Sequence, residues 1–420
     1  MKLISDINIR EDLYPRLKKD PVLAQKYAEN ISVLPAIEIN QHGDLIDGWH
    51  RLTAYRTAGE TEIPVIITET SSDVETLKLA IMRNASHGKQ LNEEDKKGMA
   101  LRLFNGGEGI GDKNELAVIL SVSVKTIGRY LEYVEKRLKE DRETKIKELW
   151  MACSTEEEIA GAVGIAKTNV SRKTEECSNI DTCPKWNKVH ALYEEETFTP
   201  PLYNVWKFSK SSNEVSHFGN SEQTIVDNLL YLYTNPFDIV VDPFAGGGST
   251  IDVCQKRSRR YWVSDRKPIP AREHEIRLHD IKDGVPPLNR RWSDVSLTYL
   301  DPPYWRQAEG KYSDDAEDLA NQPLNEFTDN MINLVNEIAK RQSKGVIALL
   351  IQPTQWRADN KQFTDHVFDI IAGVKNLPVE TRVSCPYNSE QYTPQMVNWA
   401  KENKKLLTLT RELIVWRCDK

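Results

Sequence analysis

The second half of the chain contains five short apolar segments, and four of them end on an aspartate. Most of these segments are apolar throughout, as strands covered on both faces should be. Helical stretches separate several of them, and this alternation builds parallel sheets. The pattern therefore predicts an α/β fold with a parallel, doubly wound sheet that binds ligands at the carboxyl ends of its strands. The five segments are residues 238–242, 260–265, 275–280, 295–301 and 345–351.

A chain of 420 residues suggests two to four domains, because domains usually have about 100–200 residues. The N-terminal stretch alternates short apolar runs with turns, and we expect a helix over residues 50–59 and a strand over residues 63–68. A helical, polar stretch and then a linker precede the sheet region. The predicted parts are residues 1–91 (an α+β domain), 92–177 (helical), 178–201 (linker) and 202–420 (the sheet domain).

Two segments of the helical region have the spacing of a helix-turn-helix. Ser121 takes the turn position of the first, and Gly164 takes that of the second. In DNA-binding versions, the residues that open the second helix reach the bases, but the same pattern also occurs as plain helix packing. The candidate DNA-binding residues are Lys125, Thr126 and Arg129 in the first segment, and Lys167, Asn169 and Arg172 in the second.

The formal net charge of -7 means that any contact with DNA must rest on local basic patches. Basic residues gather at residues 256–260, with Arg266 and Lys267 close behind. Two interpretations stay open for this run: a surface that contacts phosphates, or a solvated helix end.

Glycines follow the first predicted strand, at residues 246–248. They would let the backbone approach a ligand closely, although a plain turn has the same composition. Asp265 closes the next strand and could accept hydrogen bonds from ribose hydroxyls, or cap a helix. Asp280 closes the third strand, where it could accept from an adenine amino group or cap a turn.

The tetrad Asp301-Pro302-Pro303-Tyr304 follows the fourth predicted strand. Two consecutive prolines fix the backbone and donate no hydrogen bonds, which leaves oxygen acceptors at this place. The side chain of Asp301 and the carbonyl of Pro302 could take both protons of a base amine. Tyr304 offers a flat ring on which an extruded base could stack.

The glycine segment DPFAGGGST followed by DPPY resembles the amino-methyltransferases of DNA. The resemblance implies a Rossmann-like methyltransferase domain that uses S-adenosylmethionine and no metal. It implies methyl transfer to N6 of adenine in double-stranded DNA, with N4 of cytosine as the alternative, because cytosine enzymes more often have Ser first and Trp last in the tetrad. The implied catalytic residues are Asp301, Pro302, Pro303 and Tyr304. The implied cofactor-binding residues are Asn220, Ser221, Asp242, Phe244, Ala245, Gly246, Gly248, Asp265 and Asp280.

Residues 43–59 are similar to the ParB-like N-terminal domain, which is also related to sulfiredoxin. The similarity extends over the strand expected at residues 63–68 and over residues 83–95. Trp49 stands where sulfiredoxin has its cysteine, so that activity is not expected. The resemblance implies a DNA-binding or scaffolding role, with a bound nucleotide as the alternative. A nucleotide phosphate would meet Gly48, His50 and Arg51, with Arg83 and Asn84 as a second contact; the alternative for His50 and Arg51 is a buried structural pair.

Two other readings of the whole chain stay open. One is a ParB-like DNA-binding regulator whose methyltransferase domain is inactive. The other is a protein glutamine methyltransferase, although such enzymes carry Asn where this chain has Asp301. The six cysteines are scattered and form no CxxC pair, which fits a reducing cytosol. The sequence has no signal peptide and no apolar run long enough to cross a membrane, so we expect a cytoplasmic protein without a membrane partner.

Overall fold

The computed structural model describes residues 1–15, 20–86, 91–105, 111–178, 198–207, 222–306, 318–354, 363–387 and 392–419. These residues form two compact units, Met1–Asp141 and Arg142–Lys420. The division falls inside the long helix α6 (Val124–Met151), whereas the sequence suggested boundaries at residues 91, 177 and 201. The second predicted helix-turn-helix therefore belongs to the same compact unit as the sheet.

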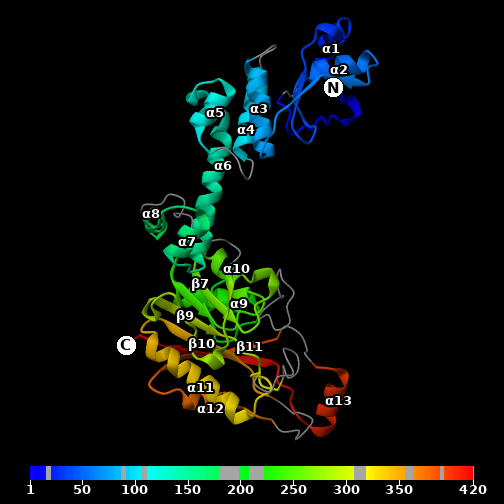
Figure 1. The fold of residues 1–420 in the computed structure, drawn as a ribbon. Coiled ribbons are helices and arrows are strands. Elements are labelled where there is room, and N and C mark those ends of the chain that lie inside the picture. The colour runs from blue at the N-terminus through cyan, green and yellow to red at the C-terminus, as the bar shows by residue number, and fades with distance from the viewer. Residues whose placement is uncertain are drawn as a thin grey trace. The chain divides into compact units, whose positions relative to one another are not determined.

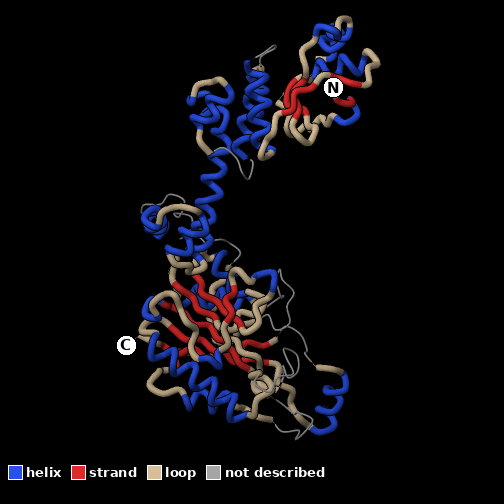
Figure 2. Tube along the Cα trace, in the orientation of Figure 1, coloured by secondary structure: helices blue, strands red, loops and turns tan. Residues whose placement is uncertain are grey.

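The first unit begins with a small α+β layer (Figures 1 and 2). Its three-stranded sheet has the order β3-β2-β5, and Ile37 and Leu52 are fully buried in its core. The strand expected over residues 63–68 is split at Pro64, which has no N–H for the sheet ladder. The elements are β1 (Lys2–Leu3), α1 (Pro21–Ala28), β2 (Ile37–Ile39), β3 (Leu45–Asp47), α2 (Trp49–Thr57), β4 (Glu62–Ile63) and β5 (Val65–Ile67).

A helical cluster completes the first unit. It consists of α3 (Asp73–Ser86), α4 (Glu93–Asn105), α5 (Lys113–Leu120) and the first turns of α6. Leu116 of α5 and Ile127 of α6 are fully buried in its core. Ser121 ends α5 with φ +49°, so the chain does turn at the residue that the sequence indicated.

The second unit holds a seven-stranded sheet with the order β11-β12-β10-β9-β6-β7-β8. The five strands predicted from sequence are present, and each is parallel to its neighbours among the five. Two further strands were not predicted, and β12 is antiparallel to both strands beside it. The strands are β6 (Ile239–Asp242), β7 (Arg260–Asp265), β8 (Ile276–Leu278), β9 (Val295–Leu300), β10 (Val346–Ile351), β11 (Val379–Pro386) and β12 (Thr410–Arg417).

Helices cover both faces of this sheet (Figure 1). On one face, α9 and α10 share a core with α7, α8 and the end of α6. On the other face, α11 and α12 pack on β10 and β12, with Phe327 and Trp416 fully buried. The helices are α7 (Glu156–Val163), α8 (Lys167–Ser178), α9 (Gln223–Tyr233), α10 (Ser249–Lys256), α11 (Leu324–Arg341), α12 (Val367–Gly373) and α13 (Pro394–Asn403). Within the described ranges, no helix combines the length and apolar character that a bilayer-spanning segment requires.

The arginines of the basic run at residues 256–260 are largely structural, which corrects both interpretations of these arginines, a surface that contacts phosphates and a solvated helix end. Arg257 is 3% exposed and binds Asp227 through two hydrogen bonds of 2.7 Å. Arg259 is equally buried and donates to the carbonyl of Thr234 at 2.8 Å. These two guanidinium groups are therefore not available to DNA phosphates.

Three arginines of the sheet unit bind backbone carbonyls at the end of α6. Arg260 donates to the carbonyl of Trp150 at 3.2 Å, and its guanidinium carbon lies 4.5 Å from the centroid of that ring. Arg277 donates to the carbonyl of Ala152 at 2.9 Å, and Arg290 donates to that of Ser154 at 2.6 Å. Cations at the C-terminus of a helix bind carbonyls that have no partner within the helix. These arginines thus fasten the end of α6 to the sheet.

Candidate active site

A pocket of about 640 Å³ lies at the carboxyl ends of β6, β7, β8 and β9. The chain passes from β6 outward through β7 and β8 and then returns to β9 on the other side of β6. Such a switch point is where open α/β sheets bind ligands. The lining includes Phe244 and Gly246 after β6, Asp265 at the end of β7, and Asp301 after β9. One cavity therefore brings the glycine turn and the first residue of the tetrad together.

The glycine turn is organised by Asp242, which is 2% exposed and lies outside the pocket lining. Its carboxylate accepts from the N–H of Phe244 at 2.8 Å and from the hydroxyl of Thr250 at 2.5 Å. Burial raises its pKa from 3.8 to about 7, and the two hydrogen bonds act against this rise. Asp242 thus holds the glycine turn in place by hydrogen bonds and does not line the pocket itself.

The glycines of this turn are not equally open to a ligand. Gly246 borders the pocket with φ +50° and donates its N–H to Asp265 at 3.0 Å. Arg272 covers Gly248, whose φ is +86°, and a Cβ there would lie 2.8 Å from the guanidinium. Ala245 is buried and donates to the carbonyl of Ser264 at 3.0 Å. A ligand in the pocket therefore meets the turn at Phe244 and Gly246.

Two carboxylates line the pocket beyond the turn. Asp265 accepts from the N–H of Gly246 and, at 2.8 Å, from that of Lys267. Asp280 accepts from the N–H of Lys282 at 3.1 Å, as a cap of the short turn that follows it. Asp280 thus performs the capping role that the sequence allowed, whereas Asp265 caps no helix, because the next helical turn begins at Pro270. Carboxylate oxygens have about four lone-pair sites, so both can also accept from a ligand.

In the tetrad, the carboxylate of Asp301 accepts from two phenol hydroxyls. Tyr304 lies 3.1 Å from one of its oxygens and Tyr299 lies 3.3 Å from the other. Burial raises the pKa of Tyr304 above its ordinary value, so this hydroxyl keeps its proton and acts as a donor. Asp301 and Pro303 line the pocket, while Pro302 is buried. The tetrad thus presents a fixed carboxylate to the cavity.

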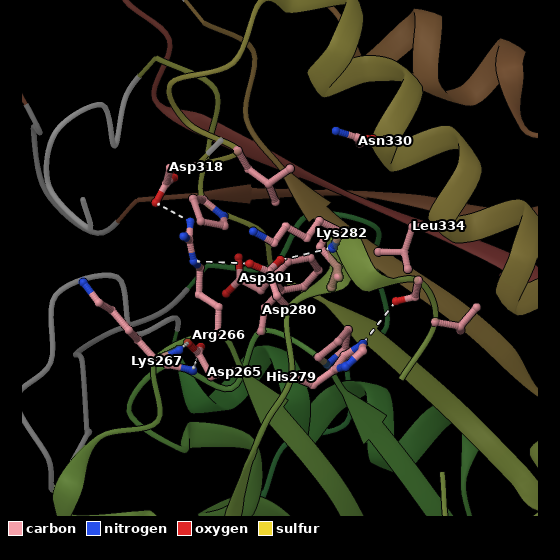
Figure 3. Close-up of a pocket in the computed structure, with 18 of the residues that line it drawn as sticks. Asp265, Arg266, Lys267, His279, Asp280, Lys282, Asp301, Asp318, Asn330 and Leu334 are labelled. Atoms are coloured by element: carbon pink, nitrogen blue, oxygen red, sulfur yellow. Dashed lines mark hydrogen bonds and ion pairs between the residues drawn. The ribbon is translucent and has the colours of Figure 1, made fainter. Parts of the chain in front are cut away.

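Sequence reasoning missed several residues that line the pocket. Arg266 and Asp318 line the pocket and bind each other (Figure 3). Asn330 and Leu334 of α11 close its other side. Arg266 was visible in the sequence as part of a basic group, but neither interpretation of that group, a surface that contacts phosphates or a solvated helix end, placed it in this pocket.

Beside the tetrad, Arg411 of β12 is 3% exposed and pairs with Glu222 at 2.6 Å. Glu222 directly follows Asn220 and Ser221, which were expected to bind the cofactor, and its carboxylate is paired with Arg411. Asn220 and Ser221 themselves lie outside the described residues. Residues 307–317 lie outside them as well, and Asp318–Ala320, which follow, are buried.

The candidate DNA-binding residues open α6 and α8, as the sequence predicted. Lys125 is exposed, and Arg129 pairs with Glu93 at 2.6 Å with 65% of its side chain exposed. Thr126 is half-buried and bonded to Ser123. In the second segment, Lys167 contacts Glu157, Arg172 lies 3.7 Å from Glu176, and Asn169 is exposed.

The residues expected to meet a nucleotide in the first unit have partners within it. Arg51 donates to Asp47 at 2.6 Å and to the carbonyl of Pro35 at 3.1 Å. Arg83 pairs with Glu38 at 2.7 Å. Asn84 donates to the carbonyl of Ala80 at 2.8 Å, and Gly48 precedes α2 with φ +110°. These contacts give both arginines a structural role within the first unit. A nucleotide bound at these residues stays a prediction.

A family model described as DNA methylase matches residues 129–268, about a third of the chain. The matched span includes the glycine turn and Asp265 but ends before Asp280 and the tetrad. None of the curated proteins matches the chain.

Solved structures give only distant likenesses. ParB from Caulobacter crescentus, complexed to the centromeric parS site, is 14% identical, with 44% of this chain and 89% of that chain covered and a TM-score of 0.24. Precorrin-6y C5,15-methyltransferase from Geobacter metallireducens is 11% identical over 52% of this chain and 98% of that chain, with a TM-score of 0.27. An rRNA methylase from Streptococcus thermophilus is 13% identical over 47% and 96%, with a TM-score of 0.28. Scores this low indicate no function.

Proposed function

We propose that the chain is a DNA methyltransferase that moves a methyl group from S-adenosylmethionine to N6 of an adenine turned out of the duplex. The observation that carries this proposal is the single pocket that Gly246, Asp265 and Asp301 border together. A donor and an acceptor must meet within one cavity for direct group transfer. The match of residues 129–268 to the DNA methylase model supports the same assignment.

The pocket suits S-adenosylmethionine, the proposed methyl donor, in size and in chemistry. Its volume of about 640 Å³ lies in the range of sites for small ligands. Asp265 supplies acceptors for ribose hydroxyls, and Asp280 supplies one for an adenine amino group. Phe244, Ile281 and Val285 give apolar walls to the cavity. When bound, S-adenosylmethionine supplies an electrophilic methyl group on a sulfonium.

The tetrad would act on the target amine, whose lone pair is otherwise delocalised into the base. Asp301, which lines the pocket, would accept a hydrogen bond from one N–H of the amine, and the family resemblance gives the backbone carbonyl of Pro302 as the acceptor for the other. Two such hydrogen bonds would localise the lone pair toward the methyl group. Tyr304 and Tyr299 hold the carboxylate in place by their hydrogen bonds. Once the methyl group is on nitrogen, the amine loses one proton, and Asp301 is placed to receive it. Turning the base out costs about a few kcal/mol, which contacts with DNA must offset.

The DNA would be held by the exposed residues that open α6 and α8. Lys125 and Lys167 would contact phosphates, and Asn169 and Arg172 would read base edges. This assignment rests on their exposure and on the helix-turn-helix spacing.

The test is to express the wild-type chain and Asp301→Ala in cells that lack DNA methylation, and to sequence their DNA by a single-molecule method. We expect N6-methyladenine at one short sequence, with no such mark in the variant. N4-methylcytosine at one sequence would keep the reaction and change the base. Binding of labelled S-adenosylmethionine to both purified proteins is the control, since the variant retains Asp265 and Asp280. An unmethylated genome from a chain that binds no S-adenosylmethionine would refute the proposal and favour a DNA-binding regulator.

A further inference from the structure

We propose that Arg266 is a positioning residue that couples the cofactor pocket to the target-base tetrad through Asp318. This inference rests on the proposed function. Arg266 follows Asp265 at the carboxyl end of β7 and lines the pocket. Its guanidinium lies between two carboxylates, 3.2 Å from Asp318 and 3.6 Å from Asp280 (Figure 3).

Asp318 depends on this contact because its side chain is only 3% exposed. A buried carboxylate is costly unless a cation and hydrogen bonds offset the lost water. Asp318 accepts from the N–H of Ala320 at 3.1 Å, and Arg266 supplies the positive charge. Removing Arg266 would leave a buried charge with a weaker set of partners, so the residues around Asp318 would rearrange.

Residues 318–322 hold the residues directly after the tetrad. The carbonyl of Asp318 accepts from the N–H of Asn321 at 2.8 Å, which closes a turn. The carbonyl of Ala320 accepts from the N–H of Arg306 at 3.0 Å, and that of Gln322 accepts from the indole of Trp305 at 2.8 Å. Trp305 is bonded covalently to Tyr304. A continuous set of contacts therefore runs from the pocket to the tetrad.

A ligand in the pocket would act on this set of contacts at Asp280. An adenine amino group that donates to Asp280 competes with Arg266 for that carboxylate. Arg266 then turns more fully to Asp318 and strengthens the hold on Trp305. By thermodynamic linkage, cofactor and target DNA must each raise the affinity for the other by the same factor. We expect this factor to be roughly fivefold or more, which is typical of coupled sites.

The test measures the affinity of the full chain for S-adenosylhomocysteine, which cannot transfer a methyl group. Titration calorimetry is done with and without a saturating duplex that contains the methylated sequence. The wild type should bind at least fivefold more tightly with the duplex. Arg266→Gln and Asp318→Asn should each lower this ratio to about one, and the double variant should lower it no further.

Arg291→Gln is the matched control, because Arg291 pairs with Asp294 at 3.2 Å but has 83% of its side chain exposed. It should keep the wild-type ratio. Asp318→Asn preserves shape, and thermal unfolding shows whether each variant is folded. A wild-type ratio near one, or a ratio that survives in folded Arg266→Gln and Asp318→Asn, would overturn the coupling. A chain that still methylates DNA in that case retains its proposed function, whereas one that binds neither ligand loses both.

Discussion

Two groups of charged residues in the sheet unit are used in opposite ways. The aspartates that follow the strands border a cavity and keep acceptor capacity for a ligand. The arginines at residues 257–260 point into the protein, where Asp227, Thr234 and Trp150 accept their hydrogen bonds. Both groups looked in sequence like sites for a ligand. The direction of the strands decides between them, because only the carboxyl ends open onto the switch point.

The largest effect that we expect is on stability, at the arginine side of this comparison. Arg257→Ala removes one partner of an ion pair whose side chains are 3% and 14% exposed. Leaving Asp227 without its cation should lower the free energy of unfolding by about 3–5 kcal/mol. Urea unfolding followed by circular dichroism measures this. Arg291→Ala removes one partner of an exposed ion pair and should change the free energy of unfolding by less than about 0.5 kcal/mol. Equal effects of the two substitutions would mean that burial does not separate these arginines.

At the pocket side, Asp301→Asn should impair the reaction rather than the fold. The amide puts a donor where the target amine needs an acceptor, while its size is unchanged. Losing one such contact lowers kcat by roughly 10²- to 10³-fold. Single-turnover methylation measures the rate, and binding of S-adenosylhomocysteine should change less than about threefold, because Asp301 is proposed to face the target. A variant within tenfold of the wild-type rate would remove Asp301 from the mechanism.

What the sequence predicted well follows from strand direction. Asp265, Asp280 and Asp301 were expected at one edge because parallel strands end together, and the pocket contains all three. The strands β11 and β12 were missed because they mix polar and apolar residues, as in Thr410–Arg417. A strand next to an antiparallel neighbour need not be apolar throughout.

Side-chain partners that are distant in sequence could not be predicted. Arg266 and Asp318 are separated by 52 residues, and Arg411 and Glu222 by 189. Charged residues show their sign in sequence but not which of them will be buried as a pair. The second helix-turn-helix segment fits the pattern better than the first, because Gly164 takes its turn position, yet Ile159 and Val170 are part of the core shared with the sheet. The spacing of the residues predicts that two helices pack as a pair, but it does not show which other part of the protein the pair packs against.

The pH dependence of stability tests the buried state of Asp242, which lies beside the pocket but does not line it. Its pKa is raised from 3.8 to about 7 in the folded protein. Between these values the folded state binds a proton that the unfolded state has lost, so stability falls as pH rises from about 4 to about 7, by at most about 1.4 kcal/mol per unit. The side chain of Asn does not titrate, so the Asp242→Asn variant should not lose stability in this way as the pH rises. The unfolding free energy of wild type minus that of the variant should therefore decrease from pH 5 to pH 7, and a constant difference would contradict the buried, protonated state.

The smallest expected effects are on DNA binding, at charges that are exposed rather than buried. Lys125→Ala and Lys167→Ala should each weaken binding to any duplex and reduce the slope of log affinity against log salt by about one. Lys167 must first leave Glu157, but 55% and 66% of these side chains are exposed, so solvent screens this ion pair and it is easily broken. Lys145→Ala, with 55% exposure away from the start of α6, is the control and should leave the slope unchanged. If only Lys167→Ala changes the slope, α8 alone contacts phosphate, and the two helix pairs differ in function as they differ in packing.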